Sequence, residues 1–171
     1  MIIVLAGRRI DAPGADAPRF PIGNVPRVRE RIRAMLELHA PEALVCSAAC
    51  GADLLALSEA GALGLRRRVI LPFAPERFRE TSVADRPGDW GPLYDKTLEQ
   101  VECVVLTGKG EGTEAYAATN LAIFDEAGKL GKHVTAVLVW DGSSRGGDDL
   151  TAGFGDEARR RGLAVIEIST L

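Results

Sequence analysis

Six short apolar runs along the chain predict six buried strands. They cover residues 2–6, 43–47, 68–72, 101–106, 134–140 and 164–168, and most are nearly continuous in Val, Ile and Leu. Continuous apolar runs are typical of parallel strands that helices cover on both faces, whereas half-buried strands alternate between apolar and polar residues.

The segments between these runs have apolar residues at helical spacing. One stripe, at i, i+4, i+7 and i+8, consists of Val28, Ile32, Met35 and Leu36. A second helix is expected over residues 54–63. Because strand and helix alternate, we predict an α/β fold: a single, doubly wound, Rossmann-like domain over residues 1–171, with a mainly parallel sheet of about six strands.

Two further helices are expected towards the C-terminus. One covers residues 114–129, with Ala117, Leu121 and Phe124 on one face. The other covers residues 149–161 and is expected to be interrupted at Gly153 and Gly155, because glycine weakens a helix interior.

Two stretches, residues 7–24 and 81–92, do not fit the alternation and predict long loops after the first and third strands. The first leaves the sheet at its carboxyl edge, where the ligands of doubly wound sheets bind. Long loops in compact domains commonly carry binding residues.

Composition narrows the class of partner. The net charge of −3 provides no general attraction to nucleic acid or to an anionic membrane, so neither partner is expected.

Three cysteines in apolar surroundings, Cys103 among them, suit reduced thiols in the cytoplasm. His39 and His133 do not stand at ligand spacing, so no metal site and no cofactor is expected. The apolar run at residues 1–6 is too short for a signal sequence or a membrane span.

The first of two glycine-bearing loops joins a strand to a helix at residues 47–53. Its candidate ligand-binding residues are Ser47, Ala49, Cys50, Gly51 and Asp53. The serine hydroxyl and the free N–H groups at the helix start are suited to a phosphate, and the aspartate to capping N–H groups. The alternative is a tight turn that needs small residues for packing.

The second loop, residues 108–114, precedes another helix. Its candidate residues are Gly110, Gly112, Thr113 and Glu114. They do not form a P-loop, because no Gly-Lys-Ser/Thr follows at the required spacing. They do not form a dinucleotide fingerprint either, because the third glycine is misplaced.

Arginines follow the first strand. Gly7, Arg8, Arg9 and Arg19 are candidate ligand-binding residues, because guanidinium groups bind phosphate in bidentate fashion. The alternative for the arginines is surface solubility or pairing with nearby aspartates. Asp141, after the fifth strand, is suited to accept a hydrogen bond from a ribose hydroxyl, or belongs to a plain turn.

The first loop and its helix resemble the SLOG superfamily, a Rossmann-like group that includes Lonely Guy phosphoribohydrolases and the DNA-processing protein A family. The resemblance rests on residues 46–57 (CSAACGADLLAL) and on residues 110–114 (GEGTE), which are similar to the family element Gly-x-Gly-Thr before a helix. Residues 7–13, 18–21, 71–73 and 78–83 are similar to a bacterial branch found beside signalling modules. The resemblance implies a nucleotide-derived ligand that is either sensed or cleaved.

Cleavage of the N-glycosidic bond would need a carboxylate. In Lonely Guy enzymes it is the last residue of Pro-Gly-Gly-x-Gly-Thr-x-x-Glu. Setting Gly112 and Thr113 on the Gly-Thr of that motif puts Tyr116 at the carboxylate position. Glu111 and Glu114 fall elsewhere; Glu114 is the candidate catalytic residue of the hydrolase interpretation, and Glu111 is the alternative.

The leading prediction is a sensor domain that binds a nucleotide or nucleotide-derived signalling ligand across both glycine loops. The alternative is an N-glycosidic hydrolase, phosphoribohydrolase-like, that acts on a nucleoside monophosphate or related nucleotide. A third interpretation is an interaction module that contacts protein through Phe20, Trp90 and Tyr94. A homodimer is also expected.

Overall fold

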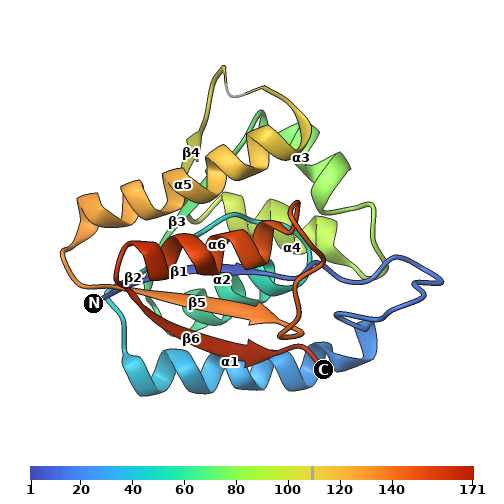
Figure 1. Cartoon of the computed structure of the whole chain (residues 1–171), viewed down its shortest axis with the longest axis horizontal. Coiled ribbons are helices and arrows are strands. Elements are labelled where there is room, and N and C mark those ends of the chain that lie inside the picture. Colours follow the sequence, from blue (N-terminus) through green and yellow to red (C-terminus); the bar gives the residue numbers. More distant parts are fainter. Residues whose placement is uncertain (109) are drawn as a thin grey trace.

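Six parallel strands form one sheet in the order β4-β3-β2-β1-β5-β6 (Figure 1). The computed structural model describes residues 1–108 and 110–171. The strands are β1 (Ile2–Gly7), β2 (Ala43–Cys46), β3 (Arg66–Leu71), β4 (Glu102–Val105), β5 (Val134–Trp140) and β6 (Ala164–Ser169). The predicted α/β class with a Rossmann-like parallel sheet is confirmed.

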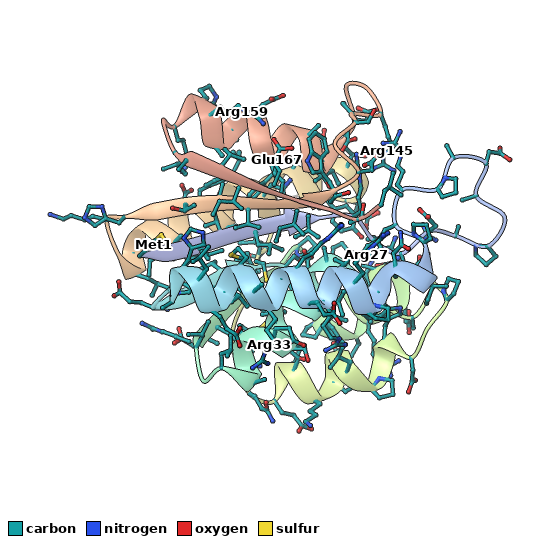
Figure 2. The ribbon with its side chains drawn as sticks, turned by 90° about the horizontal axis from the view of Figure 1, so that it is seen from below. Met1, Arg27, Arg33, Arg145, Arg159 and Glu167 are labelled. Carbon is teal, nitrogen blue, oxygen red and sulfur yellow. The ribbon has the colours of Figure 1, made fainter. Side chains whose placement is uncertain are left out.

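Helices cover both faces of the sheet. They are α1 (Val25–His39), α2 (Ala52–Ala62), α3 (Pro75–Ser82), α4 (Trp90–Leu98), α5 (Gly112–Leu130) and α6 (Leu150–Arg160), with a short 3₁₀ turn at Ile22–Asn24. Figure 2 shows the sheet between α1 and α6. Helices α1 and α2 pack together on one face, and α5 and α6 pack together on the other.

The central strand β1 shows why the apolar runs are continuous. Ile3 and Leu5 belong to the core that faces α1 and α2, whereas Ile2 and Val4 belong to the core that faces α5 and α6. Successive side chains of a strand point to opposite faces, and both faces are buried here. The predicted stripe of α1 is also confirmed, since all four of its residues are buried.

Helix α6 is continuous, so the predicted interruption at Gly153 and Gly155 is wrong. Asp149 caps the helix and accepts a hydrogen bond from the N–H of Thr151 at 3.0 Å. A Cβ on Gly155 would lie 2.7 Å from Cδ1 of Leu138 on β5. The close packing of α6 on β5 therefore accounts for a glycine inside the helix.

The sheet edge at β4 is more exposed than predicted. Cys103 is exposed, against the expectation of a buried thiol, and Val105 is 39% exposed. Of the three residues predicted to share one face of α5, Phe124 is buried, whereas Ala117 is exposed and Leu121 is 45% exposed. Ala115 and Ile123 are buried instead. Strand β4 has a neighbour on one side only, and α5 has apolar residues around much of its circumference, so the spacing did not identify its buried face.

The predicted loop at residues 81–92 is confirmed for residues 83–89 but is helical at both ends, because α3 extends to Ser82 and α4 begins at Trp90. Only residues 83–89 connect these helices. Tyr94 packs on Phe78, with ring centroids 6.1 Å apart. The proposed protein-contacting aromatics are buried in the core: Phe20 (0% exposed), Trp90 (5%) and Tyr94 (2%). These three residues therefore pack in the core and form no exposed contact surface.

The order of the strands creates a switch point between β1 and β5. The chain adds β2, β3 and β4 on one side of β1 and then returns to place β5 on the other side. At such a point the loops that follow the two strands diverge and leave a crevice at their carboxyl ends. No helix within the described residues is long and apolar enough to cross a membrane.

Candidate functional site

A cavity of about 480 Å³ lies at the carboxyl edge of the sheet, beside the switch point. This volume falls within the range of about 300–1,000 Å³ typical of small-molecule sites. Five arginines line it: Arg8, Arg9, Arg19, Arg86 and Arg145. Its uncharged polar lining consists of Ser47, Ser82, Tyr116, Thr119, Asn120 and Thr151.

Arg8 joins the end of β1 to the connection between β5 and α6. Its Nη1 and Nη2 donate to Oδ1 and Oδ2 of Asp149 at 2.7 and 2.9 Å, and its Nε donates to Oδ1 of Asp141 at 2.7 Å. Nη2 also donates to the carbonyl oxygen of Ser143 at 2.7 Å. Protein acceptors thus occupy most of the guanidinium group. Arg8, predicted to bind phosphate, holds the wall of the cavity.

The two aspartates of this cluster are also occupied. Asp141 accepts from Arg8 on one oxygen and from Nη1 of Arg19 on the other, at 2.8 Å, so the predicted ribose acceptor is engaged by two arginines. Burial would raise the pKa of Asp149, but hydrogen bonds from Arg8 and from backbone N–H groups hold that pKa well below its usual range.

A second group of arginines keeps more donor capacity. Arg9 and Arg86 share one carboxylate, that of Asp85. Within the described part of the chain, Nε of Arg9 is buried without a hydrogen-bond partner. Arg145 is 55% exposed and approaches the already neutralised Asp149 at 3.6 Å. Arg86 and Arg145 are therefore the guanidinium groups best placed to receive an anion, whereas the free Nε of Arg9 is buried away from the cavity.

The charges around the cavity do not cancel. Four carboxylates lie near the five arginines, those of Asp11, Asp85, Asp141 and Asp149, and burial shifts Asp53, a further acidic residue of the lining, toward its neutral form. Asp11 accepts hydrogen bonds from the backbone N–H groups of Arg19 and Phe20. A surplus of positive charge therefore remains in a partly enclosed space, where it attracts an anion more strongly than on an open surface.

The first glycine loop uses most of its N–H groups within the protein. The N–H of Ala49 donates to Oδ2 of Asp53 at 3.2 Å, that of Cys50 to the carbonyl of Ser82 at 3.0 Å, and that of Ala52 to the carbonyl of Arg8 at 3.2 Å. The prediction that these N–H groups receive a phosphate is therefore wrong. Ser47 and Ala49 do line the cavity, as predicted, whereas Cys50 and Gly51 are not among its lining residues.

The glycines of this region serve close packing. Gly51 has a φ of +95°, and a Cβ there would lie 2.7 Å from the carbonyl oxygen of Arg8. A Cβ on Gly7 would overlap Cβ of Ala52 and lie 2.6 Å from the carbonyl oxygen of Val139. Both glycines let the start of α2 approach the end of β1, so the alternative interpretation, a tight turn made of small residues, accounts for them.

Asp53 lies on the first turn of α2 and lines the cavity. It caps Ala49, as predicted, and the residue is only 7% exposed. Burial raises the pKa of Asp53 to about 7, although the hydrogen bond from Ala49 and the charge of Arg9 oppose this shift. Such a pKa in a cavity is typical of groups that exchange a proton with a ligand or substrate.

Helix α5 forms a polar wall that the sequence interpretation missed. Tyr116, Thr119, Asn120 and Ile123 line the cavity at i, i+3, i+4 and i+7 of that helix. Oη of Tyr116 hydrogen-bonds Oγ of Ser82 at 2.8 Å. Nδ2 of Asn120 donates to the carbonyl of Leu150 at 3.0 Å. The helical spacing of these four residues is the signal that would have identified the wall.

The second glycine loop does not take part in the cavity. Among its described residues, Gly110, Gly112, Thr113 and Glu114 are exposed and none lines the cavity, while Lys109 lies outside the described residues. The loop follows β4, whereas the first glycine loop follows β2, two strands away in the sheet. The second loop therefore contributes no described residue to the cavity lining, and Glu114 lies outside that lining.

Comparison with known proteins adds no assignment, because the sequence matches no protein-family model and none of the curated proteins. A function must therefore be argued from the cavity itself. Among the described residues, no group of acidic, histidine or cysteine side chains is arranged to hold a metal ion.

Proposed function

We propose that this domain binds a nucleotide or a nucleotide-derived signalling molecule in the switch-point cavity and acts as a sensor. The observation that carries the proposal is the surplus of guanidinium groups in a cavity of about 480 Å³ at the carboxyl edge of the sheet. Doubly wound sheets bind ligands at this edge, and arginine is the residue best suited to phosphate.

The two sides of the cavity suit the two parts of such a ligand. Arg86 and Arg145 keep N–H groups that suit phosphate oxygens. The wall on α5 offers Tyr116 and Asn120, an aromatic ring and an amide of the kind that contacts a nucleobase. An anionic group and a flat polar ring are therefore the two features that the proposed ligand must have.

This arrangement modifies the SLOG-like mode of binding. The phosphate is held by arginine side chains, because the N–H groups of Ala49, Cys50 and Ala52 are already satisfied. Membership of the SLOG superfamily is part of the proposal, supported by the resemblance of residues 46–57 and 110–114 and by the Rossmann-like sheet.

The test is isothermal titration calorimetry against AMP, NAD, ADP-ribose and cyclic dinucleotides. We expect one equivalent of at least one of these ligands to bind, with a Kd of about 1–100 μM. Binding should weaken as the salt concentration rises, because partly exposed guanidinium groups are screened. No binding by any member of the panel would contradict the proposal.

The position of Asp53 in the cavity and its raised pKa favour a second candidate function, that of an N-glycosidic hydrolase. A buried carboxyl with a pKa of about 7 in the cavity is suited to general acid–base catalysis, whereas the sequence-predicted Glu114 lies outside. If this candidate is correct, incubation with a nucleotide releases free base, and Asp53→Asn abolishes the release while Glu114→Gln retains it. Recovery of intact nucleotide after prolonged incubation would exclude it.

A further inference from the structure

Asp53 is the buried carboxyl of the cavity that lacks a cationic partner. Asp149, whose side chain is 0% exposed, accepts two hydrogen bonds from Arg8 and others from backbone N–H groups. Asp53 accepts one hydrogen bond, from the N–H of Ala49 at 3.2 Å, and forms no ion pair within the described residues. A buried carboxylate without a cation is costly, so the neutral acid is favoured at this position.

One oxygen of Asp53 is open to the cavity. Oδ2 accepts the N–H of Ala49, whereas Oδ1 has no hydrogen bond among the described groups. Among the described residues, the side-chain polar atom that is both fully buried and without a hydrogen-bond partner is Nε of Arg9. Oδ1 of Asp53 also has no partner, so it is not fully buried. Since Asp53 lines the cavity, Oδ1 is the oxygen that a ligand can reach.

We propose that Asp53 determines ligand specificity as a neutral acid, donating a hydrogen bond from Oδ1 to an acceptor atom, so that above about pH 7 the complex forms with uptake of a proton from solvent. The inference rests on the proposed function and names the residue that selects the ligand. The acceptor is a phosphate oxygen, a base carbonyl or a ring nitrogen. An ionised Asp53 would instead accept a hydrogen bond from a ribose hydroxyl or an amino group, and the complex would then release a proton.

The titration of Asp53 can be distinguished from that of the thiols near it. The other titratable and charged groups that line the cavity are Arg8, Arg9, Asp11, Arg19, Arg86, Tyr116 and Arg145. Asp85, Asp141 and Asp149 lie behind this lining and pair with its arginines, and Cys46 and Cys50 are buried near Asp53 and Arg9. Burial raises the pKa of Cys46 and of Cys50, so neither thiol ionises near neutral pH.

The two histidines lie away from the cavity. The carbonyl of His133 accepts the N–H of Ile2 at the amino end of β1, and His39 ends α1 just before β2 begins. Both are therefore at the opposite edge of the sheet.

An anionic ligand beside Asp53 raises the pKa of that carboxyl further, so binding and proton uptake favour each other.

The test measures affinity by calorimetry from about pH 6 to about pH 8.5, with NAD and cyclic di-AMP as probes. NAD carries a pyrophosphate bridge and cyclic di-AMP carries phosphate diesters. The charge of both groups stays constant over this pH range, unlike the charge of a phosphate monoester. We expect the affinity to fall about tenfold between about pH 6 and pH 8. Repeating the titration near pH 7.5 in two buffers of different ionisation enthalpy should report net proton uptake.

Two variants complete the test. Asp53→Asn keeps a donor of similar shape, so the affinity near pH 6 is retained within about threefold and its dependence on pH disappears. The matched control is Asp16→Asn, which removes an exposed carboxyl of the β1–α1 loop outside the cavity lining and leaves the pH profile unchanged.

The outcomes separate this inference from the proposed function. Affinity that is independent of pH, or that rises with pH, overturns the inference and leaves nucleotide binding intact. A pH dependence that survives in Asp53→Asn overturns it as well. Failure of both probes and of the whole nucleotide panel to bind at any pH overturns the proposed function, and the inference with it.

Discussion

The guanidinium group of Arg8 lies against the carboxylate of Asp149, with two N–O distances of 2.7 and 2.9 Å between residues 141 positions apart in the sequence. Arg8 follows β1 and Asp149 caps α6, so this bidentate pair ties together the two sides of the switch point. It fixes one wall of the cavity before any ligand arrives. A preformed wall lowers the entropic cost of binding.

Asp149→Asn should destabilise the protein by about 3–5 kcal/mol, because it leaves the buried charge of Arg8 without its main partner. Urea unfolding followed by circular dichroism measures this loss. The matched control is Asp156→Asn, which changes an aspartate of the same helix that is 80% exposed and pairs with Arg159 at 3.4 Å. Its expected cost is below about 0.5 kcal/mol. Equal costs for the two variants would contradict the role given to the pair.

Gly51→Ala should cost about 3 kcal/mol or more in unfolding free energy, since the new Cβ meets the carbonyl oxygen of Arg8 at a positive φ. The control is Gly64→Ala, at a φ of +71° with nothing within 4 Å of the new Cβ. It isolates the conformational cost, which is about 1–2 kcal/mol. The difference between the two variants measures the steric contact, and a difference near zero would refute that contact.

Stability near neutral pH should depend on Asp53. Its pKa in the folded protein is raised to about 7, above that of the unfolded chain, so its contribution is fully present at low pH and is lost as the pH rises through about 7. Relative to Asp53→Asn, the wild type should therefore lose at most about 4 kcal/mol between about pH 4 and about pH 7. Urea midpoints of both proteins at several pH values measure the difference, which would stay constant if Asp53 were ionised throughout.

Anion binding should depend on the arginines that keep free donors. Arg86→Gln and Arg145→Gln are each expected to weaken nucleotide binding about tenfold, because each removes a guanidinium group that lines the cavity. The control is Arg159→Gln, near the far end of α6 from Arg145 (Figure 2). This variant and Glu114→Gln should both bind like the wild type. A loss caused equally by Arg159→Gln would indicate a general charge effect.

The sheet was predictable from the sequence because burial on both faces demands continuous apolar strands. The stretch Ile2–Gly7 illustrates this, since its side chains are needed in two different cores. Helix α1 was predictable for a related reason, because one apolar stripe faces the core and the rest faces water. By contrast, α3 is short and mostly polar, and only Phe78 and Ser82 are buried in it, so no helical period was visible.

The sequence predicted a ligand site at the sheet edge where the cavity lies. It assigned the phosphate to backbone N–H groups, three of which are hydrogen-bonded within the protein. The sequence indicates free N–H groups at the start of α2, yet the carbonyls of Arg8 and Ser82, which come from distant segments, already accept two of them. The involvement of Arg145 depends on how the β5–α6 connection folds back, which local patterns do not encode. Asp53 was singled out as a capping residue, but its burial depends on the tertiary packing of α2.

The most direct test of the central claim is a crystal structure of the protein soaked with the nucleotide that binds most tightly in calorimetry. The account predicts that its phosphate contacts Arg86 or Arg145, that its base lies against Tyr116 on α5, and that Oδ1 of Asp53 lies within about 3 Å of an acceptor atom of the ligand. A nucleotide bound instead at the exposed loop before α5, with the switch-point cavity filled by water, would contradict it.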